Sequence, residues 1–128
     1  MARIWLTLGA VCGLISVALG AFGAHGLRGR VAEPLLATWG TGADYLGMHA
    51  LALLACGLLA LHLPGSRLIE AAGWCFAIGS LLFSGSLFAL VLSGLRGLGA
   101  ITPFGGTLLI AGWALLALGA WRNLEPGG

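Results

Sequence analysis

The residues best suited to chemistry in this sequence are Tyr45 and His49, which stand four positions apart in the segment YLGMHALALL. In a helix this spacing places both side chains on one face. His25 ends the preceding apolar stretch, on the same side of the membrane as the start of the stretch that contains Tyr45. The three side chains could therefore meet at that membrane surface, with Asp44 close by. Two interpretations stay open. One is a small polar site for a lipid headgroup, a quinone or a metal. The other is a hydrogen-bonded clamp that joins the first two helices and satisfies a buried, neutral imidazole.

Other chemistries are disfavoured by the placement of the ionisable residues. Haem ligation by His25 and His49 would place both axial ligands near one surface of the membrane, and the sequence holds only one such pair. Asp44 and Glu70 stand at the ends of apolar stretches, whereas ion-coupled transporters carry an ionisable residue deep in a span. No nucleophile has a base at usable spacing. We therefore expect no enzyme, no proton-coupled transport, and no metal or other cofactor.

Apolar helices must position these residues. The chain is 59% hydrophobic and 8% charged, against about 25% charged residues in soluble domains. A helix needs about 20 apolar residues to cross a bilayer, and four stretches have that length. These predicted spans are residues 5–24, 43–63, 68–92 and 103–121. Because short connections make consecutive helices antiparallel, we expect an all-α, integral membrane four-helix bundle with up-down-up-down topology. It would form a single membrane domain over residues 1–128.

The connections between the spans give further signals. Residues 31–39, with Pro34 suited to a first helical turn, could form a short interfacial helix or begin a long second span. Ser66 and Thr102 are predicted N-caps of the third and fourth helices. The tryptophans stand mostly near span ends, as interfacial anchors do.

Small residues follow a helical register in two spans. In the first they are spaced four, three, four and three residues apart, which places them on one helix face. In the fourth they recur every seven residues. The positions are Gly9, Gly13, Ser16, Gly20 and Gly23 in the first span, and Gly105, Gly112 and Gly119 in the fourth. Both patterns predict faces on which another backbone packs closely.

The third span adds a cluster of small polar residues, Ser80, Ser84, Gly85 and Ser86. A buried serine can bond to the carbonyl four residues back or to a neighbouring helix.

The three cysteines lie inside spans without a CxxC pair, so we expect small buried side chains and not a disulfide or a zinc site. The net charge of +2 comes from arginine alone and does not favour nucleic-acid binding. Three arginines fall on each side of the membrane, so the positive-inside rule gives no orientation.

Several motifs resemble a known family. They are GAFGAHGL (20–27), TGADYLGMHALALL (41–54), FSGSLFALVLSG (83–94), and ITPFGG (101–106) with AGW (111–113). In this order they are similar to the small bacterial membrane proteins called domain of unknown function 423, and to eukaryotic transmembrane protein 256. The resemblance implies a compact four-helix protein of the bacterial inner (plasma) membrane, and no activity. The family's patterned segments include His25, Tyr45, His49, Ser84, Ser86, Thr102 and Pro103. Asp44 falls within one segment but is not part of the pattern.

The leading functional hypothesis is a structural or accessory subunit that docks through its glycine-rich faces against itself or a larger membrane complex. The alternative is a module that binds or transports a lipid or small amphiphile at the His25–Tyr45–His49 end. Glycine faces that point outward would favour the first hypothesis. Glycine faces that pack inside the bundle, together with an open polar pocket, would favour the second.

Overall fold

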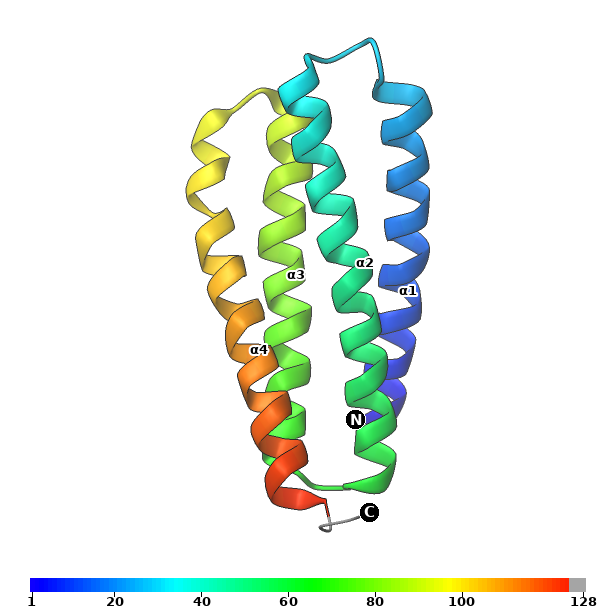
Figure 1. Cartoon of the computed structure of the whole chain (residues 1–128), viewed down its shortest axis with the longest axis vertical. Coiled ribbons are helices and arrows are strands. Elements are labelled where there is room, and N and C mark those ends of the chain that lie inside the picture. The colour runs from blue at the N-terminus through cyan, green and yellow to red at the C-terminus, as the bar shows by residue number, and fades with distance from the viewer. Residues whose placement is uncertain (125–128) are drawn as a thin grey trace.

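Four long helices joined by short turns make up the computed structural model (Figure 1). The structure describes residues 1–124, so the last four residues of the expected domain lie outside it. The helices are α1 (Ala2–Phe22), α2 (Glu33–His62), α3 (Arg67–Ser93) and α4 (Thr102–Asn123). A π-helical turn, Gly23–Leu27, extends α1, and a 3-10 turn, Arg96–Ala100, precedes α4. Figure 1 places the start of α1 and the end of α4 at the same end of the molecule.

The predicted fold class is confirmed. All four helices are long and apolar enough to cross a membrane. Each packs most extensively on its neighbour in sequence, which gives the up-down-up-down order. In Figure 1, α1 and α4 lie on opposite sides of the α2–α3 pair.

Gly65 and Ser66 form the tight turn that connects α2 to α3. Gly65 has a φ of +83°, a conformation that glycine adopts without steric cost. The Ser66 hydroxyl then accepts a hydrogen bond from the Ile69 amide at 3.4 Å, so the predicted cap of α3 is confirmed. At the other end of α3, Gly94 has a φ of +74° and terminates the helix in the left-handed conformation.

A separate interfacial helix at residues 31–39 does not form. α2 begins at Glu33 and runs without interruption to His62, so residues 33–39 are the first turns of a long second span. Gly40 and Gly42 do not break it, because tertiary contacts hold this part of the helix. Trp39 is only 3% exposed, and the Phe88 ring of α3 packs where Gly42 has no side chain.

Two of the tryptophans expected at the membrane interface are buried instead. Trp5 is 1% exposed and its indole lies against Gly73 of α3. Trp39 packs against Gly23, and its indole N–H donates to the Leu19 carbonyl at 2.7 Å. Each glycine leaves the space that a large ring then fills, so these rings pack helices together. Trp121, at 87% exposed, faces outward as an interfacial anchor would.

Candidate functional site

His49 is a buried polar residue near the middle of α2, and both of its ring nitrogens are bonded. Its Nδ1 lies 2.7 Å from the Tyr45 carbonyl oxygen. The Trp113 indole N–H on α4 donates to Nε2 at 2.9 Å. Because the indole can only donate, Nε2 is the acceptor and Nδ1 carries the proton. The imidazole is therefore neutral, and no free lone pair is left on it for a metal.

Aromatic rings surround this hydrogen-bonded pair. Phe76 of α3 packs against both partners, with ring centroids 5.7 Å from His49 and 5.1 Å from Trp113. One turn along, the Tyr45 ring stacks on Phe83 of α3 with centroids 4.5 Å apart. The cluster therefore joins α2, α3 and α4.

The structure corrects the expected clamp between the first two helices. His25 and Asp44 are exposed, and within residues 1–124 neither side chain makes a hydrogen bond to another group. Tyr45 contributes its backbone carbonyl to His49, and its ring is 40% exposed. The spacing of Tyr45 and His49 does place them on one helix face, but that face meets α3 and α4. A different face of α2 packs on α1.

The contact between α1 and α2 uses the small residues of α1. A β-carbon added at Gly9 would lie 2.9 Å from the Ala50 carbonyl oxygen. The Ser16 hydroxyl donates to the Ala43 carbonyl at 2.8 Å. Gly20 differs, because a β-carbon there would meet no heavy atom within 4 Å. Most of this face of α1 is therefore covered by α2 of the same chain.

The predicted glycines of α4 also pack against another helix of the same chain. Gly105 lies against the α3 backbone at Phe83, Gly112 against the Phe76 ring, and Gly119 against Leu68 and Ile69. All three are buried. The helix face predicted from the seven-residue repeat therefore lies against α3.

Thr102 does not cap α4, contrary to the sequence prediction. Its hydroxyl instead lies 2.6 Å from the Ser86 hydroxyl of α3. The reason is that the 3-10 turn leads into α4 through Ile101, whose φ of −80° and ψ of −34° are already helical. Thr102 is therefore inside the helix and cannot occupy the non-helical position of a cap.

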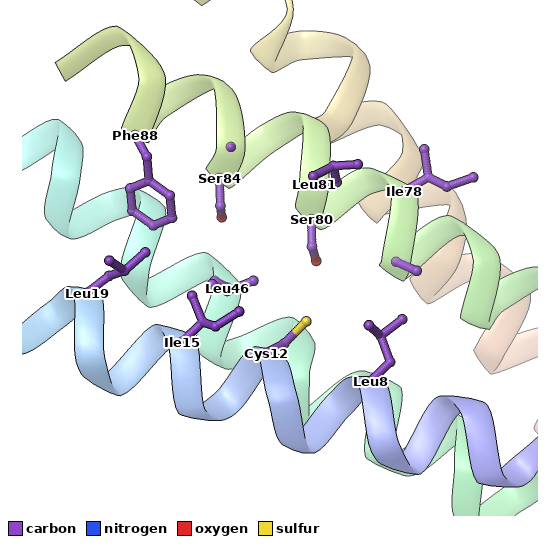
Figure 2. A pocket seen from close by; sticks show the side chains of 12 residues that line it. Leu8, Cys12, Ile15, Leu19, Leu46, Ile78, Ser80, Leu81, Ser84 and Phe88 are labelled. Atoms are coloured by element: carbon purple, nitrogen blue, oxygen red, sulfur yellow. The ribbon is translucent and has the colours of Figure 1, made fainter. Parts of the chain in front are cut away.

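The sequence did not predict a groove of about 430 Å³ that lies between α1 and α3. Figure 2 shows the two helices facing each other across it, with Leu46 of α2 behind. The lining is almost entirely apolar and includes Leu8, Cys12, Ile15, Leu19, Leu46, Ala77, Ile78, Ser80, Leu81, Ser84, Gly85 and Phe88. Ile15, Ile78 and Leu81 are exposed at its edge, so the groove opens toward the surrounding lipid.

Two serines of the third span point into this groove (Figure 2). The Ser84 hydroxyl donates to the Gly42 carbonyl of α2 at 2.7 Å. The Ser80 hydroxyl is buried and has no hydrogen-bond partner among the residues described. The small-polar cluster was the one sequence signal for this site. It could not distinguish a serine that bonds a neighbouring helix from one that faces a cavity.

Breaking the His49–Trp113 bond should reveal a small coupling between α2 and α4. We expect the variants His49→Leu and Trp113→Phe to show a coupling energy of about 0.6 kcal/mol in a double-mutant cycle, the average for hydrogen bonds between membrane helices. Reversible unfolding in mixed micelles measures it. Trp121→Phe is the control, because that ring is exposed and should give no coupling with His49→Leu. Additive effects of His49→Leu and Trp113→Phe would contradict the bond.

Comparison with known proteins supports the membrane assignment. The family described as "Protein of unknown function (DUF423)" matches residues 19–106. The UPF0382 membrane protein YwdK of Bacillus subtilis is 42% identical over 95% of this chain and 99% of its own length. A UPF0382 membrane protein of Staphylococcus haemolyticus is 40% identical over 94% of this chain and 97% of its own length. No solved structure matches significantly. The predicted resemblance and membrane localisation are thus confirmed.

Proposed function

The chain belongs to the DUF423 family, and we propose that it binds the apolar part of one membrane-derived molecule in the groove between α1 and α3. The observation that carries this proposal is the groove itself, which is apolar, preformed and open to lipid. Its volume of about 430 Å³ lies within the range of about 300–1,000 Å³ that is typical of ligand pockets. No charged residue lines it, so the bound part is uncharged.

Contacts at both ends of the groove hold its walls apart without a ligand. Near one end, the buried Trp5 of α1 lies between the two helices, with its indole against Gly73. Near the other end, Trp39 of α2 lies between them: Phe88 of α3 packs on its ring, with centroids 4.7 Å apart, and its indole N–H donates to the Leu19 carbonyl of α1. Since large buried rings resist compression, α1 and α3 cannot close the space by moving together. A lipid chain or another apolar molecule is the material available to fill it.

The accessory-subunit hypothesis has less support. It relied on glycine faces that remain free for a partner, and the glycines of α1 and α4 mostly contact other helices of the same chain. Gly20 is open, but a single position does not make a packing face. The polar end at His25, Tyr45 and His49 likewise supports ligand binding less well than the groove does, because His49 is fully bonded within the chain.

A groove-filling substitution tests the proposal. The Cys12 side chain points into the groove (Figure 2), so Cys12→Phe should occupy it. The matched control is Cys75→Phe, the same change on α3 at a half-buried position outside the groove. Native mass spectrometry of protein purified in mild detergent measures the co-purified lipid.

We expect about one bound molecule per wild-type chain and a similar value for Cys75→Phe. Cys12→Phe should retain about tenfold less, which corresponds to about 1.4 kcal/mol of lost contact. Equal retention by all three proteins would refute the groove as the binding site. Co-purification of a defined protein partner that is lost in Gly20→Leu would move the accessory role ahead.

A further inference from the structure

Ser80 stands at the centre of the third span. α3 runs from Arg67 to Ser93, so Ser80 is the same number of residues from either end. At a rise of 1.5 Å per residue, the side chain is about 20 Å from each end of the helix. In a helix that crosses the bilayer, this position lies near the midplane, where the environment is hydrocarbon.

The Ser80 hydroxyl is not satisfied within the protein. The residue is 3% exposed, and its hydroxyl oxygen is buried with no hydrogen-bond partner in residues 1–124. Helix serines commonly donate to the carbonyl four residues back, and Ser93 does so toward Ala89 at 2.6 Å. Ser80 instead points across the groove toward α1, on the side of Cys12 (Figure 2). A buried hydroxyl without a partner is costly in an apolar environment, so a bound molecule that supplied an acceptor would be favoured.

We infer that the groove takes an uncharged amphiphile that brings a carbonyl or hydroxyl oxygen to Ser80, and not the acyl chain of a phospholipid. This inference rests on the proposed function of the groove. The hydrocarbon core of a bilayer is about 30 Å thick, so the ester oxygens of a phospholipid lie about 15 Å from its midplane and cannot reach Ser80. The occupant is therefore a largely apolar molecule with an oxygen on or within its apolar body.

Two probes of equal length isolate the contribution of the oxygen. They are 7-tridecanone, with a central carbonyl, and tridecane, which has none. Their binding to the protein in micelles is measured by saturation-transfer NMR titration, after correction for partition into empty micelles. We expect the wild type to bind the ketone about fivefold more tightly, the factor given by one net hydrogen bond.

Ser80→Ala should lose this preference while its affinity for tridecane stays unchanged. The control Ser93→Ala, which removes an exposed hydroxyl of the same helix, should keep the preference. A preference that persists in Ser80→Ala overturns the role of Ser80. Equal binding of both probes by the wild type overturns the oxygen requirement but leaves the groove as a lipid site. Binding of neither probe, or equal binding by Cys12→Phe, overturns the proposed function and this inference together.

Discussion

Replacing Gly105 by alanine is expected to destabilise the protein by about 1–3 kcal/mol or more, the range for inserting atoms into a well-packed interface. Gly105 lies where α4 comes closest to α3. A β-carbon there would be 2.8 Å from the Phe83 Cα and 2.9 Å from the Gly79 carbonyl oxygen. These are backbone atoms, which cannot turn away as a side chain can. The two helices would have to separate, and the Ser86–Thr102 bond one turn away would be strained with them.

Gly106→Ala is the matched control for this substitution. A β-carbon at Gly106 would meet only the Phe83 ring, at an ordinary distance of 3.7 Å. Since alanine also favours a helix over glycine, this variant should be neutral or slightly more stable. Unfolding in mixed micelles compares the two variants directly. Equal stability of Gly105→Ala and the wild type would contradict the close approach of α4 to α3.

The second large effect is expected at Gly9 of α1. Gly9→Leu should destabilise the α1–α2 pair by about 1–3 kcal/mol or more, because its β-carbon would lie 2.9 Å from the Ala50 carbonyl oxygen. Leu54 also borders the site, but its side chain can move. The backbone carbonyl of Ala50 cannot, so α1 must shift.

Gly20→Leu, at another position of the same sequence pattern, should cost little. No heavy atom lies within 4 Å of an added β-carbon there, and a leucine would extend into lipid. The measurement is the unfolding midpoint of both variants beside the wild type. Similar destabilisation by Gly9→Leu and Gly20→Leu would show that the whole repeat packs uniformly, against the structure.

The comparison of Gly9 with Gly20 shows what the periodicity of small residues can and cannot predict. The alternating four- and three-residue spacing of the small residues from Gly9 to Gly23 identified the face of α1 that meets α2, because residues three and four apart share one side of a helix. The same spacing included Gly20, which has no neighbour within reach. Which positions on a face meet another backbone depends on where the two helix axes cross, and the periodicity of one helix carries no information about that crossing.

The tryptophans likewise show that position in the sequence does not predict which side chains are buried. Their positions near span ends are typical of interfacial anchors, and Trp121 does face outward. Trp5 and Trp39 are buried because glycines on other segments, Gly73 and Gly23, leave space for their rings. That space exists only after residues distant in sequence have come together.

The sequence by itself determined the membrane location, the four helices and their antiparallel order, because apolar length and short connections act locally along the chain. It also identified His49 as a buried, neutral side chain. Only the tertiary structure decided that His49 bonds Trp113 on α4 and not a group on α1, and that α1 and α3 leave a groove with Ser80 inside it. The physical reason is that a helix in lipid has apolar residues on every side. Hydrophobic pattern therefore cannot indicate which face meets which neighbour, and packing and hydrogen bonding between specific residues settle it.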